Sequence, residues 1–146
     1  MTSVIRAVFF DIGGTLGDVD GGSLLLTPYP GSVDLVRAMK NELGLRTGIL
    51  TNAGTLRAKA VLDMLEAAGF GGLFDEATVV TSADAGVAKP DPAIYLLAAS
   101  RVPLLPAECL FVGENEGEVQ GALRAGMSAA LKPLRASGSS GRSSPQ

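Results

Sequence analysis

The feature that most constrains the fold is an apolar run, Val4 to Phe10, that ends in a single carboxylate, Asp11. Most of the run is β-branched or aromatic, which predicts a strand covered on both faces, as in a parallel sheet. Asp11 would then stand at the carboxyl end of this strand, where open α/β sheets place their ligands. Gly13 and Gly14 follow, and they predict a sharp turn whose N–H groups are open to an anion.

Composition suits one domain and excludes several classes of function. The 146 residues are 47% apolar, which indicates a sizeable core. The net charge of −3 without a basic stripe argues against DNA as a partner. The chain has no histidine, which excludes a histidine base, a histidine-ligated metal and a Ser-His-Asp triad. One cysteine, with no signal peptide and no long apolar run, predicts a cytoplasmic protein that does not enter a membrane.

Strand-like and helix-like segments alternate along the rest of the chain. Further strands are expected at residues 45–50, 76–81, 109–112 and 127–131, and helical patterns lie between them. Right-handed crossovers make this an α/β fold, a doubly wound parallel sheet of about five strands with helices on both faces. Residues 17–31 predict a short hairpin or flap over the strand ends. Residues 1–135 are expected to form the domain, and the Ser/Gly-rich residues 136–146 a disordered tail.

Polar groups that follow the strands are expected to meet at one edge of this sheet. They are Asp11, Thr51, Lys89 (in the loop of residues 82–89) and Glu114. A carboxylate that attacks, a hydroxyl, a lysine and magnesium-binding acids are the parts of phosphoryl transfer through an aspartyl intermediate. Each residue alone has a plainer explanation, since Thr51 could cap a helix and Lys89 could be solvated. Their order along the chain favours the shared site.

The motifs that carry these residues resemble the haloacid dehalogenase (HAD) superfamily, over residues 4–133. They are Phe10 to Leu16, Leu50 to Asn52, Lys89 to Pro92 and Gly113 to Glu118. The resemblance implies a HAD-type Rossmannoid fold and a magnesium-dependent hydrolase, most simply a phosphatase in the phosphoric monoester hydrolase class. It also implies a phosphorylated substrate.

The resemblance assigns roles to individual residues. Asp11 would be the nucleophile, and Thr51 and Lys89 would complete the catalytic set. The phosphate-binding residues would be Gly14, Thr51, Asn52 and Lys89. The Mg²⁺ ligands would be Asp11, the Gly13 carbonyl and Glu114, with Glu118 as a supporting acid.

The chain departs from the superfamily pattern in three ways. Phosphatases of the superfamily usually carry an aspartate two residues after the nucleophile as general acid and base, and here that residue is Gly13. Such help is worth about 10²–10⁴-fold in rate, so slow turnover is expected. Glu114 and Glu118 replace aspartates, and the longer arm matters because Mg²⁺ demands near-ideal geometry. Residues 16–29 and 52–89 leave no room for a cap domain, so the site should be open to large or macromolecular substrates, or be closed by an oligomer partner.

Two functions therefore stay open. One is a phosphatase with weakened acid–base chemistry, and the other is a catalytically degenerate HAD domain that binds phosphate, metal or a protein partner without turnover. Dehalogenation and phosphonate cleavage are disfavoured because they use cap residues. A response-regulator receiver fits poorly, since a single Asp follows the first strand. A dinucleotide-binding domain fits worse, since no G-x-G-x-x-G follows that strand.

Overall fold

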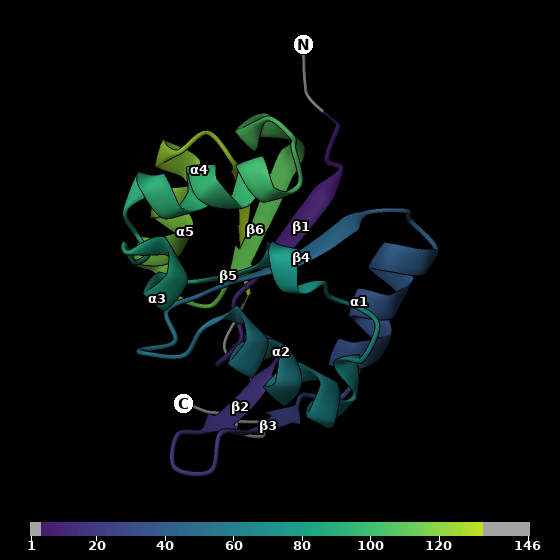
Figure 1. Ribbon diagram of the computed structural model, residues 1–146. Coiled ribbons are helices and arrows are strands. Elements are labelled where there is room, and N and C mark those ends of the chain that lie inside the picture. Colours follow the sequence, from purple (N-terminus) through teal and green to yellow (C-terminus); the bar gives the residue numbers. More distant parts are fainter. Residues whose placement is uncertain (1–3, 133–146) are drawn as a thin grey trace, which may run out of the picture.

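Five parallel strands form the centre of the protein, which confirms the predicted doubly wound α/β architecture. The computed structural model describes residues 4–132, so the expected tail at residues 136–146 lies outside the described residues. The strands are β1 (Ala7–Phe10), β4 (Arg46–Thr51), β5 (Val79–Thr81), β6 (Cys109–Gly113) and β7 (Ser128–Leu131). Their order across the sheet is β5-β4-β1-β6-β7, so β1 is central (Figure 1).

This order places a topological switch point at the strand that carries Asp11. The chain leaves β1 for β4 and β5 on one side, then returns to β6 and β7 on the other. Parallel α/β sheets bind ligands outside the carboxyl ends of the strands at such a point, because the loops there diverge and leave a crevice. Asp11 directly follows β1, and Glu114 directly follows β6, so both flank the switch point.

Helices cover both faces of the sheet, which explains why the strands read as continuous apolar runs. On one face lie α1 (Ser32–Asn41) and α2 (Ala58–Leu65), and on the other lie α3 (Ser82–Ala85), α4 (Pro92–Arg101) and α5 (Glu116–Arg124) (Figure 1). Side chains of β1 alternate between two cores. Val8 and Phe10 pack in the first with residues of α1 and α2, and Ala7 and Phe9 pack in the second with residues of α4 and α5.

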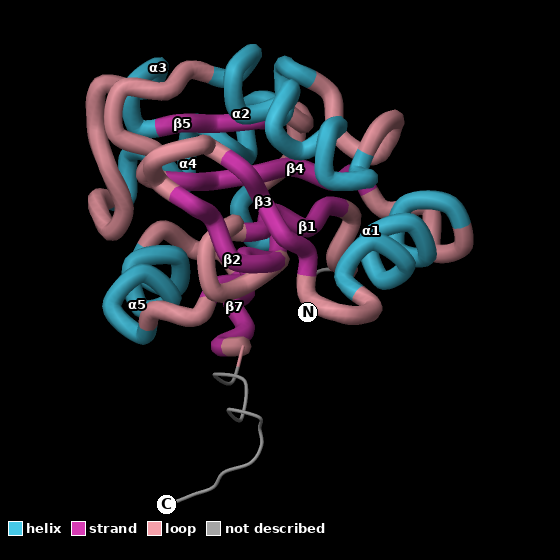
Figure 2. The backbone as a smooth tube through the Cα atoms, turned by 90° about the horizontal axis from the view of Figure 1, so that it is seen from below, coloured by secondary structure: helices cyan, strands magenta, loops and turns pink. Residues whose placement is uncertain are grey.

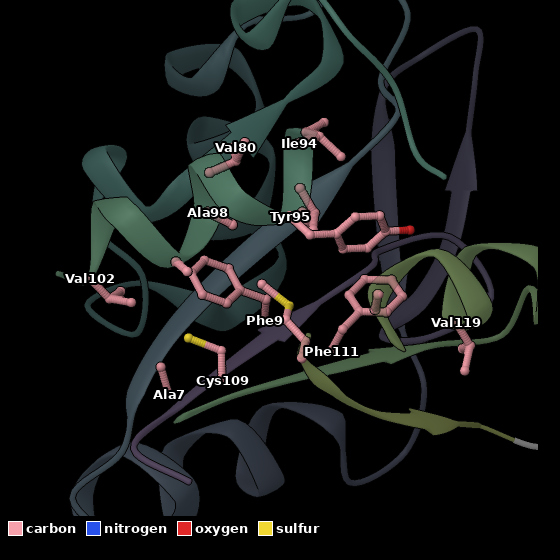
Figure 3. Packing of buried hydrophobic residues seen from close by; sticks show 14 residues of the cluster. Ala7, Phe9, Val80, Ile94, Tyr95, Ala98, Val102, Cys109, Phe111 and Val119 are labelled. Atoms are coloured by element: carbon pink, nitrogen blue, oxygen red, sulfur yellow. The ribbon is translucent and has the colours of Figure 1, made fainter. Parts of the chain in front are cut away.

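The core beneath α4 and α5 contains an aromatic pair close to the site. The rings of Tyr95 and Phe111 meet edge to face, with 5.7 Å between centroids and 84° between planes (Figure 3). Both side chains are fully buried. The Tyr95 hydroxyl donates a hydrogen bond of 2.6 Å to the backbone carbonyl of Glu118, which ties the core to the first turn of α5.

Short turns refine two of the sequence predictions. The third predicted strand is shorter than expected, because its first half is a 3₁₀ turn, Glu76–Thr78. The predicted loop of residues 82–89 begins with the one-turn helix α3, whose first turn is capped because the Thr81 hydroxyl accepts a hydrogen bond from the Asp84 N–H. The other short turns are a π turn, Glu66–Phe70, after α2 and a 3₁₀ turn, Pro106–Glu108, before β6.

An antiparallel hairpin, β2 (Gly17–Asp20) and β3 (Leu25–Pro28), confirms the predicted flap. It lies beyond the carboxyl end of the sheet, next to α2 (Figures 1 and 2). Gly17 must be glycine here, since a Cβ would overlap the carbonyl oxygen of Thr27. This hairpin takes up the chain between β1 and α1, and no cap domain interrupts residues 4–132, as predicted. No helix within these residues has the length and apolarity needed to cross a bilayer.

Candidate active site

A buried lysine ammonium lies between two carboxylates at the carboxyl end of the sheet. The Nζ of Lys89 is 3.1 Å from Asp11 Oδ1 and 2.9 Å from Glu118 Oε1. Only 1% of the Lys89 side chain is exposed, against 13% for Asp11 and 18% for Glu118. The face of the Phe111 ring lies 5.1 Å from Nζ and adds a cation–π contact. The sequence predicted Asp11 and Lys89 at one edge of the sheet, and the structure places Lys89 Nζ in contact with both Asp11 and Glu118.

The Asp11 carboxylate is oriented by two contacts on the same oxygen. Asp11 directly follows β1, and its Oδ1 accepts a hydrogen bond of 2.8 Å from the N–H of Ile12. The same Oδ1 faces Lys89 Nζ. Within residues 4–132 no hydrogen bond or ion pair falls on Oδ2, so this oxygen is available to a ligand.

The loop that carries Lys89 is held by Asn52, which follows β4. The Lys89 N–H donates to Asn52 Oδ1 at 2.9 Å, and Asn52 Nδ2 donates to the Lys89 carbonyl at 3.1 Å. Asn52 was expected to bind phosphate, and in the structure its amide also positions the lysine. Thr51, the last residue of β4, is 6% exposed. Both residues line the same pocket as Asp11 and Lys89.

The two glycines after Asp11 differ in what they can offer a ligand. Gly13 lines the pocket, and a Cβ built on it would meet no atom within 4 Å. Gly14 has a left-handed backbone, and its N–H donates to the Gly17 carbonyl at 3.0 Å. The expectation of an open N–H is therefore wrong for Gly14, because the turn into the hairpin uses that donor. Gly14 also lies outside the residues that line the pocket.

The two glutamates after β6 have different surroundings in the structure. Glu118 lines the pocket and contacts Lys89, whereas Glu114 is not among the lining residues. The Glu114 side chain lies across the loop after β1, where a Cβ on Gly14 would come within 2.6 Å of its Cγ. No three of the His, Cys, Asp or Glu side chains in residues 4–132 are grouped closely enough to hold a metal by themselves.

The first turn of α5 fixes the position of Glu118. Its N–H donates to Asn115 Oδ1 at 3.0 Å, which caps the helix. The Glu118 carbonyl accepts a hydrogen bond from the Tyr95 hydroxyl. The pKa of Tyr95 is raised above its ordinary value, mainly because the hydroxyl is buried. Tyr95 is therefore a neutral donor at physiological pH that supports the backbone of Glu118.

The pocket in front of Asp11 has a volume of about 580 Å³ and is lined by two kinds of residue. The polar lining includes Asp11, Thr51, Asn52, Lys89 and Glu118. An apolar wall is formed by the hairpin and the region of α2. Its side chains include Val19, Leu24, Leu56 and Met64. Sequence reasoning did not predict this wall, because nothing local showed where the hairpin would lie.

Comparison with known proteins identifies the family and the fold. A model of the haloacid dehalogenase-like hydrolase family matches residues 18–126, a stretch that begins after Asp11 and includes Thr51, Lys89, Glu114 and Glu118. The fold is similar to that of a HAD phosphatase from Thermococcus onnurineus, with a TM-score of 0.73 at 21% identity over 87% of this chain and 86% of that chain. An L-2-haloacid dehalogenase is similar too, with a TM-score of 0.76 at 22% identity over 88% of this chain and 86% of that chain.

Curated relatives include both phosphatases and a dehalogenase. A glyceraldehyde 3-phosphate phosphatase of Methanopyrus kandleri is 34% identical over 103 residues, which are 70% of this chain and 42% of that protein. A phosphoglycolate phosphatase of Salmonella choleraesuis is 33% identical over 67% of this chain and 36% of that protein. An (S)-2-haloacid dehalogenase of Xanthobacter autotrophicus is 37% identical over 72% of this chain and 38% of that protein. The chain thus spans less than half the length of these relatives, and it belongs to the haloacid dehalogenase-like hydrolases.

Proposed function

We propose that this protein is a magnesium-dependent phosphatase that forms an aspartyl-phosphate on Asp11. The observation that carries the proposal is the buried Lys89 ammonium held between Asp11 and Glu118. A buried cation in contact with a carboxylate offsets the repulsion between that carboxylate and an anionic phosphate. Named phosphatases among the relatives support the same reaction class.

The chemistry assigned to the residues is a two-step transfer. Asp11 Oδ2 attacks phosphorus, the bond from phosphorus to the ester oxygen breaks, and the ester oxygen leaves with the bonding electron pair and takes a proton from water. Thr51 and Lys89 bind the phosphoryl oxygens as charge moves onto the leaving group. Water then attacks phosphorus of the aspartyl-phosphate, which releases inorganic phosphate and restores the carboxylate.

The oxygen donors of the site fit a magnesium ion. Mg²⁺ prefers one or two carboxylates together with water and substrate phosphate. Asp11, the Gly13 carbonyl and Glu114 would hold it, because the missing Cβ of Gly14 lets the Glu114 side chain reach the loop after β1. Glu118 would support the site through Lys89 rather than by direct ligation. When bound, the ion would supply positive charge against the phosphoryl oxygens.

The absence of a side chain at Gly13 shapes the kinetics that we expect. No group at this position can protonate the leaving alcohol or deprotonate the attacking water. A leaving group that departs as a stable anion does not need a general acid. Hydrolysis of the aspartyl-phosphate still lacks a general base at position 13. Substrates such as p-nitrophenyl phosphate should therefore give a burst of p-nitrophenolate followed by slow turnover.

Release of p-nitrophenolate in the presence of magnesium tests the proposal. The wild-type protein should release it, and Asp11→Asn should not. Asp63→Asn serves as the matched control, since Asp63 is an exposed carboxylate that pairs with Lys59 on α2. Equal release by wild type and Asp11→Asn would refute the proposal.

The missing group at Gly13 also favours a second candidate, a domain that binds phosphate or a protein partner without turnover. Calorimetry with vanadate and magnesium separates the two. Tight binding with no turnover on any phosphoester supports the second candidate, and turnover on one of them excludes it.

A cytoplasmic location and an oligomer that covers the open site stay predictions. The cytoplasmic location is supported by Cys109, the single cysteine of the chain, which is buried and forms no disulfide.

A further inference from the structure

The pocket in front of Asp11 offers very little positive charge. Within residues 4–132, the charged side chains that line it are Asp11, Lys89 and Glu118, which makes two carboxylates and one ammonium. The ammonium already contacts both carboxylates. A phosphate group bound beside Asp11 would occupy Lys89 and any magnesium ion held there. A second anionic group on the same ligand would then meet no further cationic side chain among the described residues that line the pocket.

Two positive features lie close to the pocket, and Asp84 contacts both. Leu56 lines the pocket, and its neighbour Arg57 pairs with Asp84, with 3.2 Å between Nη1 and Oδ1. The N-terminus of α2 is a natural anion site. Asp84 uses part of this site, because its Oδ2 accepts a hydrogen bond from the Ala58 N–H at 2.9 Å. Asp84 therefore weakens the attraction that Arg57 and the N-terminus of α2 exert on an anion in the pocket.

The apolar side chains of the lining come from the hairpin and the region of α2 and are partly exposed. Val19 and Leu24 project from the hairpin and are 39% and 44% exposed, and Leu56 and Met64 come from the region of α2. A pocket of about 580 Å³ has room for more than a phosphate group. The alcohol part of the ester, which extends beyond the phosphate, would contact these side chains and lose hydration there.

We infer that this site selects phosphate monoesters whose alcohol is uncharged and partly apolar, and rejects those whose alcohol carries a second anionic group. The inference rests on the proposed function, because it assumes that the phosphate lies beside Asp11. A carboxylate on the alcohol would lose hydration against the apolar wall and gain no ion pair there. An uncharged ring or alkyl chain would gain from burial against the same wall.

Two aryl esters that differ by one carboxylate test the inference: phenyl phosphate and 4-carboxyphenyl phosphate. We expect kcat/KM to be at least about tenfold lower for the carboxylated ester, since like charges placed together at a site are costly. Equal values, or a preference for the carboxylated ester, would overturn the inference.

Binding of two phosphonates separates failure of this inference from failure of the proposed function. Phenylphosphonate and 4-carboxyphenylphosphonate cannot be hydrolysed at an ester oxygen, so calorimetry measures selection without turnover. Tighter binding of phenylphosphonate supports the inference, even if neither ester is hydrolysed and the phosphatase proposal fails. Equal affinities, or no binding of either phosphonate, would overturn it.

A cation added to the apolar wall should change the selection. For Met64→Lys we compare kcat/KM for the carboxylated ester with kcat/KM for phenyl phosphate, or the affinities of the two phosphonates. The ratio of carboxylated to plain compound should rise by about fivefold, the effect of a partly exposed ion pair. Met64→Gln is the matched control and should leave the ratio unchanged. Val19→Lys and Val19→Gln repeat the test on the exposed hairpin in case a change in α2 impairs folding. An unchanged ratio in the folded lysine variants would contradict the inference.

Discussion

Two hydrogen bonds join the side-chain amide of Asn52 to the backbone of Lys89, one to its N–H and one to its carbonyl. They connect residues that are 37 positions apart in the chain, at the ends of two neighbouring strand–loop units. The Asn52 amide thus fixes the backbone of Lys89, and from this position the Lys89 side chain reaches Asp11 and Glu118.

Asn52→Ala should destabilise the protein and misplace the lysine. Loss of two hydrogen bonds predicts a decrease of about 1–2 kcal/mol in the free energy of unfolding, measured by urea denaturation. We expect kcat/KM to fall by roughly tenfold, because small displacements of a catalytic group are costly. Asn41→Ala, at the exposed end of α1, should change neither quantity. An unchanged unfolding free energy in Asn52→Ala would show that the two bonds do not hold the loop.

Lys89→Met should abolish turnover and lower stability, because it leaves two partly buried carboxylates without their shared cation. Removal of one partner from a buried ion pair costs about 3–5 kcal/mol. Because Asp11 and Glu118 keep some exposure, we expect the lower end of that range, about 3 kcal/mol. Lys59→Met, which removes an exposed ion pair with Asp63, should cost less than about 1 kcal/mol.

A double variant separates the structural and chemical roles of this lysine. Lys89→Met combined with Glu118→Gln should recover part of the lost stability, since one of the two carboxylates becomes neutral. It should not recover turnover, because the cation beside Asp11 is still missing. Recovery of activity in the double variant would contradict the role given to Lys89.

Gly13→Asp should raise turnover. The position has open space around a built Cβ and no left-handed backbone, so the side chain can be accepted without strain. General acid–base help is worth about 10²–10⁴-fold, and the gain should be larger for phenyl phosphate than for p-nitrophenyl phosphate, whose leaving group does not need the acid. Gly14→Asp is the contrasting control, since its Cβ would lie 2.6 Å from Glu114 Cγ on a left-handed backbone. A lower rate in a folded Gly13→Asp protein would show that the missing group does not limit the reaction.

The buried thiol of Cys109 predicts a loss of stability at high pH. Burial raises the pKa of Cys109 from 9.0 to about 11. A group with a raised pKa stabilises the folded state below its unfolded pKa, and that contribution is lost as the pH rises through the folded value. The difference in unfolding free energy between wild type and Cys109→Ala should therefore shrink from pH about 9 to about 11. A constant difference across this range would contradict the shift.

The fold could be predicted because its signals are local and repeated. Apolar runs marked the five strands, and helical spacing between them required parallel crossovers. Asp11 and Lys89 could be placed together because strands in a parallel sheet end at the same edge. The order of the chain alone was enough for this part of the site.

Other parts depend on contacts that no local pattern records. The Gly14 N–H is used by Gly17, because the hairpin turns back at that point. Glu118 meets Lys89, since the cap at Asn115 and the support from Tyr95 orient the first turn of α5. Leu24 lines the pocket only because the hairpin folds over the end of the sheet.

Trapping of the covalent intermediate tests the central claim most directly. The protein is mixed with p-nitrophenyl phosphate and magnesium, quenched in acid, and treated with borohydride, which reduces an aspartyl-phosphate to homoserine; peptide mass spectrometry then locates the change. The account predicts homoserine at position 11, at a level that matches the burst of p-nitrophenolate, and none when substrate is omitted. Steady release of p-nitrophenolate with Asp11 unmodified, or with the change at another carboxylate, would contradict it.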